Sequence, residues 1–263
     1  MTPILAFDEG YVPRMWGGTR LRDVYGKPTP ADEPIGEAWL VADHAEHESV
    51  VKDGPLAGRT LRSLLEEDPR AVLGKRALPT IHGRFPLLLK LLDAGDKLSI
   101  QVHPDDEGAE RLGEPDVGKT EMWYVIEGEP GSTLYCGMPP EITVESFESA
   151  RKSGQLPNLL TQIEAHPCRS VFVPAGTVHA IGGGCLLAEI QQNSDLTYRI
   201  DDWGRVQPDG TPRALHIDKA LQVIRYGSRH AGACRWLGYS PDDAHVEVLA
   251  ACRYFAAERV TVS

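Results

Sequence analysis

The chain of 263 residues carries 27 lysines and arginines against 38 aspartates and glutamates, which gives a formal net charge of -11. This balance argues against a nucleic-acid binder, and an anionic ligand would need a local cluster of positive side chains. There is no N-terminal signal segment and no apolar run of the roughly 18 residues that span a membrane. The five cysteines lack metal-type or redox-type spacing, which fits free thiols. We expect a cytoplasmic protein that binds neither nucleic acid nor membrane.

Many short apolar runs, interrupted by 20 prolines and 26 glycines, predict a mainly β protein. The predicted strands cover residues 37–43, 85–92, 97–103, 121–128, 170–176 and 185–192. Residues 88–103 have the pattern of a β-hairpin that turns at residues 93–96, where Asp-Ala-Gly-Asp is a turn-forming sequence.

Helices are predicted to be fewer. Residues 60–74 have a cap candidate in Thr60 and an apolar stripe behind it, and residues 145–164 indicate a short helical excursion. Residues 213–226 space apolar side chains by helical turns and predict a further helix. Two strand-like runs follow residue 240. We therefore expect a main domain over residues 1–240 and a C-terminal segment over 241–263, either the start of a second small β domain or strands that pair elsewhere.

One short stretch raises a question of chemistry. If residues 99–103 form a strand, Ser99, Gln101 and His103 share one face while Ile100 and Val102 share the other. The apolar face suits a core, and the opposite face pairs an amide with an imidazole. Asp105 and Asp106, which follow, suit a turn or a set of hydrogen-bonding groups behind that face.

Two distant segments carry matching donors. Pro174, Gly176 and His179 form a P-x-G-x-x-H pattern at the end of an apolar run, and Glu121 opens another strand. Zn²⁺ takes nitrogen and oxygen ligands of these kinds, and one carboxylate leaves the metal with a net charge near +1. Residue spacing alone leaves buried structural histidines as the alternative. The candidate metal ligands are Gln101, His103, Glu121 and His179.

Over roughly residues 5 to 260 the sequence resembles the type I mannose-6-phosphate isomerases (phosphomannose isomerases), in particular their short bacterial branch, within the cupin superfamily. The motifs are "MWGGTRL" at 15–21, "IGEAWLVADH" at 35–44, "FPLLLKLLDAGDKLSIQVHPDD" at 85–106, "GKTEMWYV" at 118–125, "VPAGTVHAI" at 173–181 and "LAEIQQNSDLTYRIDDWGR" at 187–205. The resemblance implies a mainly β, cupin-type jelly-roll barrel with a few inserted and flanking helices. It also implies one Zn²⁺ per chain, ligated by Gln101, His103, Glu121 and His179.

The resemblance further implies a pocket for a phosphorylated sugar, lined by Lys90, Lys119 and Arg199. Residue patterns alone leave other roles open. Lys90 lies in an apolar run and could form an ion pair or extend to solvent, and Lys119 could be a solvated loop residue. Arg199 could form a surface salt bridge with Asp201 or Asp202.

Two more residues have two interpretations each. Glu189 lies within an apolar strand, as either a catalytic carboxylate or a buried hydrogen-bond acceptor, and Trp16 is either a pocket wall or a core residue. The implied reaction interconverts mannose 6-phosphate and fructose 6-phosphate through an enediol. Glu189, Lys119 and a metal-bound hydroxide all stay open as the general base. Arg199 is expected to assist ring opening or stabilise the enediolate, with Lys90 and Lys119 around the phosphate or sugar oxygens.

The alternatives on the same fold are an iron oxygenase and a sugar-phosphate-binding protein without catalysis, because reactions diverge readily on one fold. Positive residues around the pocket favour a phosphorylated substrate and a redox-neutral reaction. We expect a monomer or a weak homodimer.

Overall fold

The computed structural model describes residues 4–75, 77–80, 82–207, 209–227, 231–234, 237–240 and 243–262. Three residues of the predicted C-terminal segment, Pro241, Asp242 and Ser263, lie outside this range. Among the described residues, no helix combines the length and the apolar character needed to cross a membrane.

The structure is mainly β, as predicted, and its strands pair antiparallel throughout the described residues. The large sheet has the order β1-β2-β3-β10-β5-β8-β12 and the second sheet the order β11-β4-β9-β6-β7. The strands of these two sheets are β1 (Gly10–Gly18), β2 (Ile35–Val41), β3 (Leu87–Ala94), β4 (Ile100–Val102), β5 (Glu121–Gly128), β6 (Thr133–Cys136), β7 (Gln162–Glu164), β8 (Ser170–Val173), β9 (His179–Ile181), β10 (Cys185–Gln192), β11 (Tyr198–Asp201) and β12 (Gly232–Ala233).

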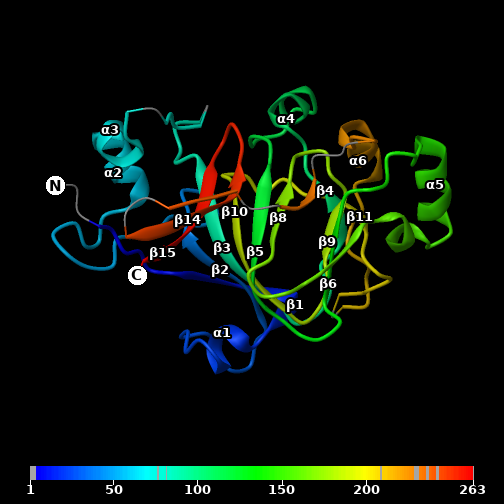
Figure 1. The fold of residues 1–263 in the computed structure, drawn as a ribbon, viewed down its shortest axis with the longest axis horizontal. Coiled ribbons are helices and arrows are strands. Elements are labelled where there is room, and N and C mark those ends of the chain that lie inside the picture. The colour runs from blue at the N-terminus through cyan, green and yellow to red at the C-terminus, as the bar shows by residue number, and fades with distance from the viewer. Residues whose placement is uncertain are drawn as a thin grey trace.

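The two sheets enclose the main core, which makes the fold a sandwich of the jelly-roll kind (Figure 1). Trp123 and Leu187 project from the large sheet toward Leu134 and Ile181 of the second sheet. Strand alternation places Ile100 and its neighbour Val102 on the other side of β4, in a second core under the helices. Gln101, between them, therefore points into the sandwich, as the alternation predicted.

Helices lie around the sandwich: α1 (Arg20–Asp23), α2 (Leu61–Glu67), α3 (Pro69–Leu73), α4 (Asp106–Arg111), α5 (Val144–Lys152), the 3-10 helix η1 (Leu156–Leu159) and α6 (Ile217–Val223). Thr60 caps α2 as predicted, by accepting a hydrogen bond from the Ser63 backbone N–H. The prediction of one helix over 60–74 was wrong in detail. Asp68 ends α2 and caps α3, because Pro69 lacks the N–H that a continuing helix needs. The helical segment predicted over 145–164 is also shorter than expected. Helices α5 and η1 occupy its first part, and its last three residues form strand β7.

The hairpin predicted over residues 88–103 is not formed. Strand β3 pairs with β2 and β10 in the large sheet, whereas β4 pairs with β9 and β11 in the second sheet. The connecting residues bond elsewhere: the Asp96 N–H donates to the Trp16 carbonyl and the Leu98 N–H donates to the Ile181 carbonyl. The chain therefore crosses from one sheet to the other at the predicted turn, and this crossing brings β4 opposite the large sheet.

The C-terminal residues form a small sheet of β13 (Leu237–Tyr239), β14 (Ala244–Ala251) and β15 (Ala256–Val262). Its apolar side chains Leu249 and Phe255 pack with Met122 of β5 on the outer face of the large sheet. The division of the chain near residue 240 stays a prediction.

Candidate active site and metal centre

Three buried side chains from distant segments meet at one end of the sandwich. His103 Nε2 lies 3.4 Å from Glu121 Oε2, and His179 Nε2 lies 3.5 Å from Glu121 Oε1. Gln101 Nε2 lies 3.3 Å from His179 Nε2, because strand pairing sets Gln101 on β4 directly opposite His179 on β9. The structure thus brings together all four residues predicted as metal ligands.

The donor atoms of this cluster suit a divalent cation. The Nδ1 atoms of His103 and His179 contact the backbone carbonyls of Leu196 and Thr177 at 2.7 and 2.8 Å, so each ring turns its Nε2 toward Glu121. Burial, then the Lys119 ammonium, lowers the pKa of His103 to about 3, which keeps the imidazole neutral. The buried Glu121 carboxylate pairs with the Lys119 ammonium through Oε2 and faces the Nε2 atoms of His103 and His179. Neutral imidazoles and a buried carboxylate are ligands of the kind that Zn²⁺ takes.

Lys119 lies against this cluster. Its Nζ is 2.7 Å from Glu121 Oε2 and 3.2 Å from His103 Nε2, and the side chain is buried. Burial alone would lower the pKa of Lys119, but the nearby carboxylates of Glu121 and Glu189 outweigh it and raise the pKa. Lys119 is therefore a charged group of the site and not a solvated loop residue.

A cavity of about 330 Å³ opens beside the cluster. Residues predicted to bind substrate or to act in catalysis all line it: Trp16, Lys90, Lys119, Glu189 and Arg199, together with the candidate metal ligand Gln101. Trp16 also packs in the main core, so both of its interpretations apply. The volume is large enough for a small sugar phosphate.

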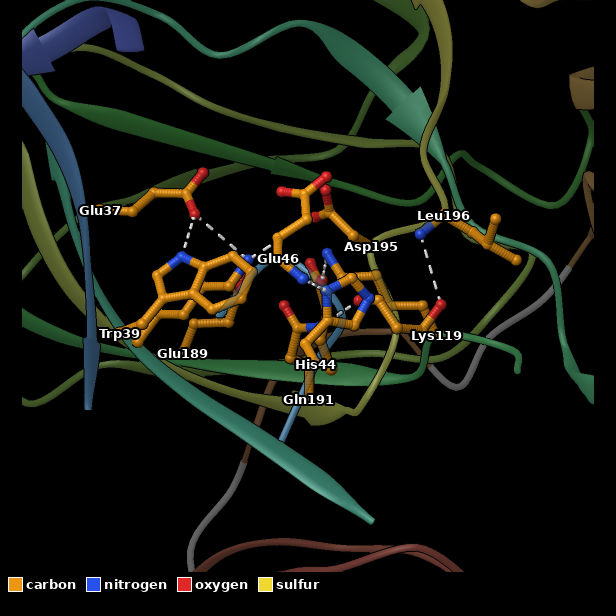
Figure 2. Close-up of polar contacts among 12 residues, drawn as sticks. Glu37, Trp39, His44, Glu46, Lys119, Glu189, Gln191, Asp195 and Leu196 are labelled. Atoms are coloured by element: carbon orange, nitrogen blue, oxygen red, sulfur yellow. Dashed lines mark hydrogen bonds and ion pairs between the residues drawn. The ribbon is translucent and has the colours of Figure 1, made fainter. Parts of the chain in front are cut away.

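Lys90 belongs to a buried ionic group at the cavity wall. Its Nζ lies 3.3 Å from Glu37 Oε2 and 3.8 Å from Asp195 Oδ1, and 4.6 Å from the centre of the Trp39 ring. Glu37 also accepts hydrogen bonds of 2.7 Å from Arg14 Nε and from Trp39 Nε1. Figure 2 shows the Trp39 indole nitrogen directed at the Glu37 carboxylate. Lys90 is thus ion-paired and lines the cavity at the same time.

Glu37 remains charged within this group. Burial would raise its pKa, but the Lys90 ammonium and the Arg14 guanidinium lower the pKa to about 2. Because Glu37 holds both cations, it sets where they stand in the cavity wall.

Arg199 makes different contacts from those that its surroundings in the sequence suggested. Its Nη1 donates to the Ala214 carbonyl at 2.9 Å, and its buried Nε has no hydrogen-bond partner among the described residues. The alternative role, a salt bridge to Asp201 or Asp202, is not formed among the described residues; Asp202 instead accepts hydrogen bonds from Arg205 Nη2 at 2.6 Å and from Arg213 Nε at 2.8 Å. Burial, then the nearby Arg213 guanidinium, lowers the pKa of Arg199.

Glu189 lies in the cavity wall, on the central strand β10 between β3 and β5. In the large sheet it stands opposite Lys90 on β3 and Trp123 on β5, and it accepts a hydrogen bond of 3.1 Å from Trp123 Nε1. Burial, then the negative charge of Glu121, raises the pKa of Glu189 to about 7. Such a group can both take up and release a proton near neutral pH.

Comparison with known proteins supports one family. The family model for the catalytic domain of type I phosphomannose isomerase matches residues 4–122. "Probable mannose-6-phosphate isomerase GmuF" of Bacillus subtilis is 44% identical over 225 residues, which cover 85% of this chain and 69% of GmuF. Mannose-6-phosphate isomerase ManA of the same organism is 37% identical over an alignment of 266 residues, which covers 100% of this chain and 80% of ManA. The chain belongs to the type I phosphomannose isomerase family.

Structural comparison agrees with this family. The crystal structure of the mannose 6-phosphate isomerase from Bacillus subtilis matches with a TM-score of 0.88 at 34% identity, over 98% of this chain and 80% of that one. A zinc-bound mannose 6-phosphate isomerase matches with a TM-score of 0.66 at 18% identity, over 94% of this chain and 83% of that one, and shows the fold alone. The predicted family and cupin-type fold are confirmed.

Several residues of this phosphomannose isomerase cavity were missed by sequence reasoning: Arg14, Glu37, Asp195 and Arg213. Strand alternation offered a signal for Glu37, which shares a strand face with Trp39 inside the family motif at 35–44. Arg213 gave no such signal, since it was only the first residue of the helix predicted over 213–226.

Proposed function

We propose that this chain is a zinc-dependent isomerase that interconverts mannose 6-phosphate and fructose 6-phosphate and holds one Zn²⁺ per chain. The observation that carries the proposal is the juxtaposition of the His103–Glu121–His179 cluster with a cavity lined by cationic side chains, in a chain of net charge -11. Lysines and arginines clustered in one cavity of a protein that is acidic overall suit a dianionic phosphate ester.

Gln101, His103, Glu121 and His179 would hold the zinc ion. When bound, zinc supplies a Lewis acid that stabilises negative charge developing on the sugar oxygens at C1 and C2. The remaining steps belong to side chains of the cavity.

Glu189 is the proposed general base. With a pKa raised to about 7 it is partly ionised at neutral pH, and it lines the cavity where the substrate would lie. It would take the proton from C2 of the open-chain aldose and return it at C1. Lys119 is less suited to this task, because Glu121 at 2.7 Å holds it in its ammonium form. Lys119 would instead donate hydrogen bonds to the enediolate oxygens.

The other cations bind and orient the substrate. Arg199 keeps a buried Nε donor without a hydrogen-bond partner among the described residues, which leaves it available to a substrate oxygen during ring opening or enediolate formation. Lys90 and Arg213 line the same cavity and would share the phosphate and hydroxyl oxygens. Trp16 forms an apolar part of the wall.

Incubation with mannose 6-phosphate in D₂O, followed by NMR, tests the reaction class. An enediol mechanism predicts fructose 6-phosphate that carries deuterium at C1, with no consumption of oxygen. Oxygen uptake dependent on iron would identify an oxygenase instead. Saturable binding of mannose 6-phosphate by zinc-loaded protein, with no product and no exchange, would identify a binding protein.

A further inference from the structure

The turn between β14 and β15 reaches back to the segment that carries the metal ligands. Tyr254, in this turn, donates a hydrogen bond of 2.9 Å from its hydroxyl to Asp106 Oδ2 at the start of α4. The turn between β14 and β15 lies near α4 at the top of Figure 1. Asp106 follows the ligand His103 by three residues, so this contact links the last strands of the chain to the site.

Asp106 also forms hydrogen bonds with residues that surround Lys119. Its Oδ1 accepts hydrogen bonds of 3.0 Å from the Gly118 N–H and from Gln192 Nε2. Gln192 Oε1 in turn accepts the Thr120 N–H at 2.8 Å, and the Gln192 N–H donates to the Thr120 carbonyl at 3.0 Å. The backbone N–H groups of Gly118 and Thr120, the residues on either side of Lys119, are therefore held by one network that includes Tyr254.

The two segments joined by Asp106 also touch directly. A Cβ atom placed on Gly118 would lie 2.4 Å from the Asp106 backbone nitrogen, a distance that side chains do not adopt. The Lys119 N–H donates to the Pro104 carbonyl at 2.9 Å. Because the backbones are in contact, a shift of Asp106 is transmitted to Lys119 and is not absorbed between the segments.

The C-terminal hairpin also packs against the residue next to the candidate metal ligand Glu121. Met122, which follows Glu121 and is buried, contacts a cluster that includes Leu249 and Phe255 of the hairpin. The hairpin thus meets the site at two points, through the Tyr254 hydroxyl and through this apolar cluster.

We propose that the C-terminal hairpin β14–β15 braces the active site, and that Tyr254 is a positioning residue that acts on Lys119 through Asp106 and Gln192. The inference rests on the proposed function for its kinetic consequence, while its structural consequence is independent of catalysis. A tyrosine hydroxyl bonded to a carboxylate is a strong neutral-to-charged hydrogen bond, so its loss loosens the Gly118–Thr120 backbone.

Hydrogen–deuterium exchange of the full chain tests the structural part. In Tyr254→Phe, amide exchange across residues 118–120 should rise about tenfold, the size of change that follows the loss of one such hydrogen bond. Tyr239→Phe is the matched control, because Tyr239 lies in the same small sheet but is exposed, and it should leave this exchange unchanged. Equal exchange in all three proteins would overturn the proposal, whether or not the chain is an isomerase.

Steady-state kinetics of the zinc-loaded protein tests the functional part. Tyr254→Phe should lower kcat about fivefold with KM within about twofold, since a displaced Lys119 acts on the transition state more than on binding. In an Asp106→Ala background the same change should have no further effect, because the network is already interrupted. A lower Tm with kcat per zinc-loaded site unchanged would show a merely structural contact and contradict the positioning role.

Discussion

Glu189 is a carboxylate in an apolar strand, and its neighbours explain how it can act at neutral pH. Lys90 stands beside it on β3 and Trp123 donates to it from β5. Burial is the largest cause of its raised pKa, and the charge of Glu121 adds to it. Its protonation state is therefore a consequence of the fold, which buries it at the cavity wall.

Replacing this carboxylate tests the assignment of the base. Glu189→Gln should lower kcat by a factor of about 10² to 10⁴, the usual contribution of a general base, with a small change in KM. Because a raised pKa of about 7 means that the base form accumulates above that pH, kcat/KM of the parent protein should rise through pH 7. The pH–rate profile measures this limb.

The exposed Glu164 on β7 provides a control for that experiment. Glu164→Gln should keep both kcat and the rising limb. Retention of that limb by Glu189→Gln would assign the base to another group.

Glu37 should contribute to stability as well as to the cavity. Replacing it with Gln leaves Arg14 and Lys90 without their shared carboxylate, which should cost about 3 kcal/mol in the free energy of unfolding. Its pKa of about 2 lies below the ordinary value of 4.5, so this contribution is complete above about pH 4.5 and is lost as the pH falls toward 2. Urea unfolding at several pH values measures the difference.

The stability gap between the parent protein and Glu37→Gln should therefore close on acidification. Glu66→Gln, at an exposed position on α2, should show no such gap. A gap of constant size from neutral pH down to about pH 3 would refute the role given to the Glu37 charge.

At the scale of elements, local signals predicted the strands well and their connections poorly. The predicted strand 121–128 coincides with β5 and 185–192 with β10, because each is an apolar run bounded by turn residues. The Asp-Ala-Gly-Asp turn at 93–96 was also recognised, but it carries no information about which sheet receives the next strand. That choice depends on bonds from Asp96 and Leu98 to distant carbonyls.

Helix α2 offers a test at this scale. Thr60→Ala removes the oxygen that accepts the Ser63 N–H and should lower the free energy of unfolding by about 1 kcal/mol. Because α2 contributes no residue to the cavity wall, kcat should not change. Chemical denaturation and the isomerase assay, run on the same preparation, measure both quantities. A much larger loss of stability, or a lower kcat, would contradict this prediction.

At the scale of the whole molecule, the site exists because the two sheets of the sandwich converge on it. Gln101 and His179 come from the second sheet, while Glu121, Glu189 and Lys90 come from the large sheet. Sequence motifs identified these residues, whereas Arg14 and Arg213 were missed because only the folded chain brings them to the cavity. The sequence therefore predicted the candidate metal ligands, but it did not predict which charged side chains would line the cavity.

We propose that zinc bound at the Gln101–His103–Glu121–His179 cluster is required for this chain to act as an isomerase. A coupled assay for fructose 6-phosphate, run on the purified, chelated and zinc-restored protein, measures it directly. We predict that activity is lost on chelation and returns in proportion to added Zn²⁺ until about one equivalent is bound. Full activity of metal-free protein, or one bound equivalent of zinc without any isomerisation, would contradict a zinc-dependent isomerase.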